Sequence, residues 1–258
     1  MAKKFKLIKK GDPEGPQPGK EMRRTMGQTM PETLKPHLGE MIVYGLLILL
    51  LMTGTYWRNR VWNSELMLSA DCVKKSPNKA RPHYNLGTVF LDQGSYQEAI
   101  NQYNEALRIN PNYAGPHNNL GNVFLNQGNY EEAISQYNEA LRINPNSAGP
   151  HNNLGNVFLK QGKYQEATNQ YNEALRIDPN FTEAHNNLGN VFSKQGKYQE
   201  AINQYNDALR IDSNIAEVHY NLGKVYLLIG DRGLALKEYD ILRTTNPGLA
   251  SALYQKMR

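Results

Sequence analysis

Five copies of one 34-residue unit follow one another from residue 80 to residue 249, and this repetition limits the possible folds more than any other feature of the chain. The copies occupy residues 80–113, 114–147, 148–181, 182–215 and 216–249. A fixed period of this length is the signature of a solenoid, in which each unit buries its apolar face only by stacking on its neighbours. Because solenoids present long surfaces, the repeat favours binding over catalysis.

Each unit predicts two helices joined by a turn that contains glycine. In the second copy, the apolar periodicity predicts helix A over about residues 115–127 and helix B over about residues 130–143. Gly128 lies in the turn, where glycine adopts a left-handed backbone without steric cost. Pro145 ends helix B and begins the link to the next unit. The repeated region is therefore expected to be all-α.

Several residues recur at the same place in every unit. A Leu-Gly pair in helix A recurs as Leu86-Gly87, Leu120-Gly121, Leu154-Gly155, Leu188-Gly189 and Leu222-Gly223. The alanine of helix B recurs as Ala99, Ala133, Ala167, Ala201 and Ala235, and the closing proline as Pro111, Pro145, Pro179 and Pro247. Ser213 replaces that proline in the fourth unit, and Leu242 replaces a second alanine in the fifth. This pattern resembles the tetratricopeptide repeat (TPR) family, and the resemblance implies a right-handed α-solenoid of five TPR helix–turn–helix repeats.

Asparagine dominates the polar positions of helix A. It occupies Asn118, Asn119, Asn122, Asn152, Asn153, Asn156, Asn186, Asn187 and Asn190, with Asn85 and Asn221 in the flanking units. A carboxamide both donates and accepts hydrogen bonds, so a ladder of them can pair with a peptide backbone whatever its side chains. TPR relatives bind extended peptides along helix A, and the repeats of O-linked N-acetylglucosamine transferases carry a similar ladder, matched here by Asn85, Asn119, Asn153, Asn187 and Asn221. We therefore predict that these asparagines bind an extended segment of a protein partner.

Recent duplication is an alternative explanation of the ladder. The second and third units are identical at 27 of 34 positions, so one asparagine could simply have been copied. The neutral lining also argues against the carboxylate-clamp mode of chaperone-binding TPR proteins, which needs Lys or Arg pairs in helix A. Only Lys160, Lys194 and Lys224 come close to that pattern.

The positive charge of the chain lies outside the repeats. Residues 1–79 hold 14 Lys/Arg and 7 Asp/Glu, whereas residues 80–258 hold 15 and 17, so the net charge of +5 comes from the N-terminal part. Phosphate binding needs positive charge on the binding face. Nucleic acid is therefore not an expected partner.

The sequence predicts no metal, no cofactor and no enzymatic activity. The repeated histidines, His83, His117, His151, His185 and His219, would lie too far apart in stacked units to share one ion, so we expect them to pack. No nucleophile–base set or phosphate loop is recognisable. The single cysteine, Cys72, falls at a position that takes small residues and is expected to be buried.

Residues 41–57 carry no charge and predict a transmembrane helix at the short end of the spanning range. Tyr44, Tyr56 and Trp57 lie near its ends, where aromatic rings favour the membrane interface. A cleaved signal peptide is the competing interpretation, but such peptides usually have a shorter apolar core and a shorter charged region. We therefore expect a single-pass protein that is held in a lipid bilayer by this segment.

The tail before this segment, residues 1–40, is rich in proline, glycine and charge and is predicted to be disordered. Its nine Lys/Arg favour a cytoplasmic tail, which would place the array on the periplasmic or luminal side. The charges that flank the span closely are balanced, so this expectation rests on the tail.

Residues 58–79 continue the repeat frame backward as a degenerate half-repeat with Pro77 at the closing position. The run from residue 58 to the first Leu-Gly pair resembles the junction in membrane TPR proteins of the protein O-mannosyltransferase-like class, where the array follows the last transmembrane helix. The multi-pass part that holds the catalytic acids of that class is not found in this sequence. Its activity is therefore not implied.

At the other end, residues 250–258 predict a short C-terminal cap. The last unit carries the apolar run Leu227, Leu228 and Ile229, which sets it apart from the other units. Either the cap covers this edge or the edge mediates self-association.

Together these features predict a membrane-tethered scaffold that binds an extended peptide segment in the concave TPR groove and raises its concentration near the membrane. One alternative is an accessory or assembly factor for a membrane complex such as a glycosyltransferase. Another is a self-assembling structural subunit.

Overall fold

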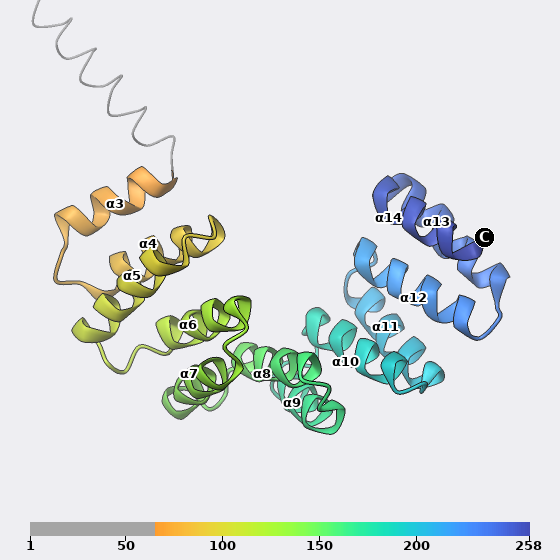
Figure 1. Ribbon diagram of the computed structural model, residues 1–258, viewed down its shortest axis with the longest axis horizontal. Helices are drawn as coiled ribbons and strands as arrows, with labels where there is room; N and C mark the ends of the chain where they lie inside the picture. Colours follow the sequence, from red (N-terminus) through yellow and green to blue (C-terminus); the bar gives the residue numbers. More distant parts are fainter. Residues whose placement is uncertain (1–64) are drawn as a thin grey trace, which may run out of the picture. The chain divides into compact units, whose positions relative to one another are not determined.

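The computed structural model describes residues 65–258, and every regular element in this range is an α-helix (Figure 1). The helices are α3 (Glu65–Lys75), α4 (Ala80–Asp92), α5 (Tyr96–Ile109), α6 (Ala114–Gln127), α7 (Tyr130–Ile143), α8 (Ala148–Lys160), α9 (Tyr164–Ile177), α10 (Thr182–Lys194), α11 (Tyr198–Ile211), α12 (Ala216–Leu228), α13 (Arg232–Thr245) and α14 (Pro247–Met257). The predicted tail, residues 1–40, and the predicted span, residues 41–57, lie outside the described residues. None of the described helices is long and apolar enough to cross a membrane.

Each 34-residue unit contains one helix pair, from α4 and α5 to α12 and α13. In the second unit, α6 begins one residue before the predicted start and α7 has the predicted bounds. Gly128 ends α6 with a left-handed backbone, at φ 79°, and so turns the chain into α7. The all-helical solenoid expected from the sequence is therefore confirmed.

The core is shared between neighbouring units rather than enclosed within each one. In one cluster, Ala133 and Tyr137 of the second unit pack with Leu154 and Val157 of the third, and all four are almost completely buried. One cluster around Tyr103 and another around Tyr171 repeat this arrangement. Since burial of apolar surface drives folding, a single unit cannot be stable without its neighbour.

Glycine lets the two helices of one unit approach each other closely. A Cβ added at Gly155 would lie 2.5 Å from Cε1 of Tyr171, whose ring therefore packs directly on the backbone of α8. Gly189 and Tyr205 repeat this contact, at 2.6 Å. This explains why Leu-Gly in helix A and an aromatic residue in helix B recur together.

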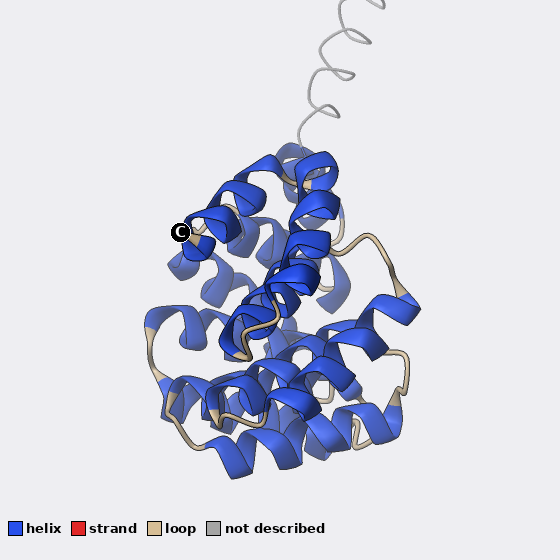
Figure 2. Ribbon diagram, turned by 90° about the vertical axis from the view of Figure 1, so that its right-hand side faces the viewer, coloured by secondary structure: helices blue, strands red, loops and turns tan. Residues whose placement is uncertain are grey.

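The first helices of the units line the inner side of the curved stack, so we call α4, α6, α8, α10 and α12 the inner helices and α5, α7, α9, α11 and α13 the outer helices. Successive inner helices contact each other directly, whereas each outer helix contacts mainly the inner helices of its own and the next unit. A stack whose layers are closer together on one side curves toward that side. Figure 1 shows the pairs following one another along an arc, and Figure 2 shows the same stack turned by 90°.

Helix α3 lies where the degenerate half-repeat was predicted and packs against α4. None of its residues is buried, and Cys72 is exposed. The expectation of a buried cysteine was therefore wrong. Among the described helices, α3 packs only against α4, whereas the equivalent Ala106 is completely buried on α5, which packs against both α4 and α6.

The C-terminal cap is longer than predicted, because α14 begins at Pro247 rather than after residue 249. Asn246 caps the helix by accepting a hydrogen bond from the Leu249 amide, and proline suits the first turn. Leu253 packs on Gly223, where a tyrosine ring lies in the other units. Thus α14 covers much of the last unit, but Leu228 and Ile229 remain 58% and 47% exposed.

Replacement of Gly155 by alanine should lower the free energy of unfolding by about 1–3 kcal/mol, because the new Cβ would overlap the Tyr171 ring. Gly149 in the same helix is a matched control, since a Cβ there meets no atom within 4 Å. Gly149→Ala should be neutral or stabilising by about 0.5 kcal/mol. Urea unfolding followed by circular dichroism measures both. Equal effects of the two substitutions would contradict this account of the close approach.

Candidate partner-binding surface

The predicted site residues all lie on the inner helices, and they differ in exposure. Asn85 is exposed, whereas Asn152, Asn186 and Asn221 are buried, at 3%, 8% and 6% exposure. The remaining members, Asn118, Asn119, Asn122, Asn153, Asn156, Asn187 and Asn190, are half-buried. The asparagines therefore form part of the packed structure as well as its surface.

Four of the five ladder asparagines connect one inner helix to the preceding one. Asn153 Nδ2 on α8 donates to Asn118 Oδ1 and to Asn122 Oδ1 on α6, at 3.1 and 3.0 Å. Asn187 Nδ2 likewise donates to Asn152 Oδ1 at 3.0 Å. Each of these amides thus bridges two units of the array.

Similar hydrogen bonds join α12 to α10 and α6 to α4. Asn221 Nδ2 donates to Asn186 Oδ1 at 3.1 Å. In the first two units the acceptors are hydroxyl groups, and Asn119 Nδ2 lies 3.2 Å from Tyr103 Oη and 3.3 Å from Thr88 Oγ1. A buried polar group needs a partner, so these contacts hold successive inner helices in register.

On α6, α8 and α10, the third asparagine is held by a tyrosine of the outer helix in the same unit. Tyr171 Oη donates to Asn156 Oδ1 at 2.7 Å, and Tyr205 Oη donates to Asn190 Oδ1 at 2.7 Å. Tyr137 Oη donates to Asn122 Oδ1 at 2.8 Å. Burial raises the pKa of Tyr137, Tyr171 and Tyr205 well above its usual value, so these hydroxyls stay protonated and donate.

These bonds leave a defined set of amide atoms without a partner among residues 65–258. Among them, we call Nδ2 of Asn122, Asn156 and Asn190 and Oδ1 of Asn153 and Asn187 the open amide set. Its donors repeat once per unit on three successive inner helices. Its acceptors lie on the two central inner helices. Such a surface can pair with the alternating N–H and C=O groups of an extended backbone.

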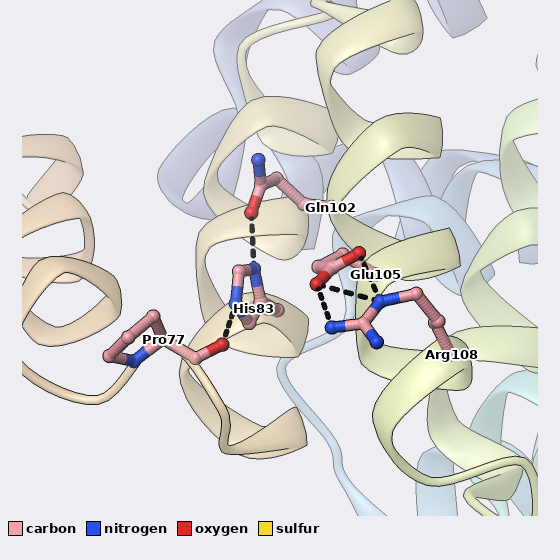
Figure 3. Close-up of polar contacts among 5 residues, drawn as sticks. All are labelled: Pro77, His83, Gln102, Glu105 and Arg108. Carbon is pink, nitrogen blue, oxygen red and sulfur yellow. Dashed lines mark hydrogen bonds and ion pairs between the residues drawn. The ribbon is translucent and has the colours of Figure 1, made fainter.

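The repeated histidines hold the two helices of a unit together. His83 Nδ1 on α4 lies 2.8 Å from Gln102 Oε1 on α5, and its Nε2 lies 3.0 Å from the Pro77 carbonyl oxygen (Figure 3). In the last unit a glutamate replaces the glutamine, and His219 Nδ1 lies 2.6 Å from Glu238 Oε2. Both ring nitrogens of His83 and His219 thus have protein partners. No group of metal-binding residues occurs within the described part of the chain.

The outer helices carry surface ion pairs on the side away from the open amide set. Arg108 lies 2.7 Å from Glu105 on α5, as Figure 3 also shows, and Arg142 and Arg176 form the same pair in the next units. The arginine lowers the pKa of the Glu105 carboxyl mainly through its hydrogen bonds. These groups are exposed, and such i,i+3 pairs contribute little to stability.

The stacked helix pairs and their Gly–Tyr contacts define an α-solenoid of helix hairpins. A family model of the TPR repeat matches residues 87–128, 121–162, 155–196 and 190–230, which is more than half of the chain. The chain therefore belongs to the TPR repeat family.

Two curated relatives share a shorter segment. Protein O-mannosyl-transferase F38B6.6 of Caenorhabditis elegans is 39% identical over 64 residues, and human Protein O-mannosyl-transferase TMTC1 is 38% identical over 64 residues. Each match covers 25% of this chain but only 9% and 7% of those proteins. The predicted likeness to this class is confirmed for that segment, and it is a small part of either relative.

Solved TPR structures have the same fold. PilF of Pseudomonas aeruginosa gives a TM-score of 0.63 at 23% identity, over 81% of this chain and 95% of that one. YrrB, a TPR protein with an unusual peptide-binding site, gives 0.52 at 24% identity, over 72% and 97%. At these identities the likeness establishes the fold alone.

Sequence reasoning missed the tyrosines that hold Asn122, Asn156 and Asn190. The signal was present, because a tyrosine stands 15 residues after each of Asn122, Asn156 and Asn190. It also treated the whole ladder as open to a partner. The spacing of 35 residues between Asn118 and Asn153 could have revealed the contact between units.

Replacement of Asn153 by alanine should lower the free energy of unfolding by about 1–3 kcal/mol, because it removes both hydrogen bonds to α6 and leaves Asn118 Oδ1 without its donor, whereas Asn122 Oδ1 keeps the Tyr137 hydroxyl. Asn172 is a matched control, since it is an exposed asparagine on α9 in the same unit. Asn172→Ala should change stability by less than about 0.5 kcal/mol. Denaturant unfolding measures the free energy of unfolding of both variants. An Asn153→Ala variant as stable as the wild type would show that the bridge does not contribute to stability.

Proposed function

We propose that this chain is a protein–protein interaction scaffold whose inner helices bind an extended peptide segment of a partner through the open amide set. The observation that carries the proposal is the repetition of Asn122, Asn156 and Asn190 Nδ2 along three successive inner helices, each fixed by a tyrosine on its oxygen side. Side chains that are already fixed in the free protein lose little conformational entropy when a partner binds. The peptide-binding site named for the TPR protein YrrB supports the same use of this fold.

The proposal includes attachment to a membrane. Residues 41–57 are uncharged and long enough to span a bilayer, and the array follows them closely in sequence. A partner bound to such an array is concentrated near the bilayer, which favours its encounter with other membrane proteins. The basic tail favours a cytoplasmic N-terminus and a periplasmic or luminal array.

A second candidate is an accessory or assembly factor for a membrane glycosyltransferase. The observation that favours it is the identity of 39% over 64 residues with Protein O-mannosyl-transferase F38B6.6. In this case the chain would present a protein substrate to a separate catalytic subunit. A transferase among the proteins that copurify with the full-length chain would support it, whereas partners without any transferase would favour the general scaffold.

Self-association through the last unit is a further candidate. The exposed apolar side chains Leu228, Ile229 and Ile241 favour it, since the corresponding positions of the other units are polar. A concentration-independent monomer in analytical ultracentrifugation would contradict it.

The triple variant Asn122→Asp, Asn156→Asp and Asn190→Asp should reduce partner recovery at least about tenfold. Each aspartate keeps the oxygen that accepts the tyrosine hydrogen bond but replaces the open Nδ2 donor with an acceptor. The array should therefore stay folded while the groove loses its donors. Copurification of the tagged full-length chain, quantified by mass spectrometry, measures the effect.

The matched control replaces Asn138, Asn172 and Asn206 by aspartate. These exposed asparagines lie on the outer helices of the same three units, so the control adds the same charge to the opposite side. Circular dichroism melting confirms that both variants are folded. Equal recovery of the partner by the two triple variants would rule out the open amide set as the binding site.

The single cysteine offers a direct test of membrane orientation. Cys72 is exposed on α3 and follows the predicted span closely, so a membrane-impermeant maleimide can report its side. In sealed vesicles with the cytoplasmic face outward, the proposed orientation predicts labelling only after detergent is added. Cys72→Ser gives the background. Labelling of intact vesicles would instead place the array in the cytoplasm.

A further inference from the structure

The last outer helix exposes a face that the other units cover. One side of α13 carries Leu236, Tyr239 and Arg243, which are spaced so that they line up along the helix. In the second unit, the residue equivalent to Leu236 is Ile134, which packs against the core that this unit shares with the third. Figure 1 shows α14 as the helix that follows α13 at the end of the stack. It leaves Leu236 42% exposed.

Aromatic rings and guanidinium groups meet on this face. The ring centroids of Tyr239 and of Tyr254 on α14 lie 5.6 Å apart. Arg243 lies 6.0 Å from the centre of the Tyr239 ring, and Arg258 lies 5.8 Å from the centre of the Tyr254 ring. These contacts join the two helices into one surface, which we call the terminal face: Leu236, Tyr239, Arg243, Tyr254 and Arg258.

The terminal face lies in the basic part of the array. Residues 228–258 hold 5 Lys/Arg and 3 Asp/Glu, whereas residues 80–227 hold 10 and 14. All five of these cations are exposed. Two of the three acids are engaged within the fold, Asp231 as the cap of α13 and Glu238 with a histidine of α12, and Asp240 lies 3.6 Å from an arginine of the terminal face. The exposed charge around this face is therefore mainly positive.

The same unit also exposes apolar side chains where other units have polar ones. Leu228 stands in the place of Asn126, and Ile241 stands in the place of Glu139. Exposed leucine and tyrosine side chains beside arginine and lysine are typical of surfaces that lie in a membrane interface. There the rings lie at the level of the headgroups, and the cations contact anionic lipid.

We propose that the terminal face docks on the surface of a bilayer that contains anionic phospholipids. This inference rests on the proposed membrane attachment, which keeps the array near a bilayer, and it adds a second contact at the other end of the chain. The leucine and the two tyrosine rings enter the headgroup region, and the two guanidinium groups donate charge-assisted hydrogen bonds to lipid phosphates. A second copy of the chain is a poorer match, because an isologous contact would bring the same cations close together.

The test uses an environment-sensitive fluorophore on the full-length chain, reconstituted in vesicles that contain spin-labelled lipid as a quencher. In a Cys72→Ser background, Gln255→Cys carries the fluorophore next to the terminal face on α14. Gln165→Cys carries it on the outer helix α9 as a matched control, and both positions are exposed. We expect quenching from position 255 and not from position 165. It should be strong in vesicles with phosphatidylglycerol, weak in phosphatidylcholine alone, and weakened by salt.

A charge variant tests the arginines of the terminal face. Arg243→Gln with Arg258→Gln should reduce the quenching from position 255 at least about fivefold, because both cations that face the lipid are lost. The control variant Lys163→Gln with Lys197→Gln removes two exposed lysines from the turns before α9 and α11, and it should keep the quenching. Circular dichroism melting confirms that both variants are folded.

Three results would overturn the inference: no quenching from position 255, equal quenching from both labels, or quenching that persists without the two arginines. An unquenched chain that forms dimers in analytical ultracentrifugation would assign the terminal face to a second copy instead. Flotation of the same vesicles separates this inference from the proposed attachment. A chain that floats with the vesicles but is not quenched overturns the inference alone, whereas a chain that does not float overturns the attachment as well.

Discussion

Every unit of this array completes its core with residues of its neighbour, and this constraint determines the rest of the structure. Tyr137 is completely buried between residues of its own unit and Leu154 and Val157 of the next. The same ring presses on a glycine of its own unit, which brings the two helices close together. Successive inner helices then lie near enough for side-chain amides to bridge them. The stacking, the curvature and the asparagine contacts thus have one origin.

The inner asparagines consequently serve two purposes. Asn153 and Asn187 use their Nδ2 atoms within the array, whereas Asn156 and Asn190 use only their oxygen atoms. Replacement of Asn119, Asn153 or Asn187 would therefore affect folding as well as binding, because their donors connect the units. The division between bridging and open atoms follows from where each residue stands on its helix.

Most of the fold could be predicted from the sequence, because a 34-residue period with glycine, alanine and aromatic residues at fixed places permits few alternatives. The helix bounds of the second unit were predicted to within one residue. The ends were harder to predict, because the pattern changes there. Cys72 occupies a small-residue position but is exposed on α3, against which only α4 packs among the described helices, and α14 starts early because Asn246 and Pro247 form a good helix start. The hydrogen-bond partners of each asparagine depend on the distance between inner helices, which periodicity does not provide.

The last unit differs from the others in its packing and in its charged residues. Leu253 replaces a tyrosine ring on Gly223, and Lys224 replaces an asparagine. Glu238 stands where the other units have glutamine. These replacements distinguish the C-terminal end of the array from the preceding units.

The most direct test of the central claim is photo-crosslinking in living cells. A photoreactive residue is placed in the full-length chain at Asn126, on the inner helix α6, or at Asn138, on the outer helix α7, and both positions are exposed. The account predicts that one segment of one partner protein is crosslinked from Asn126 and not from Asn138. Equal crosslinking from both positions, or products that join only two copies of this chain, would contradict it.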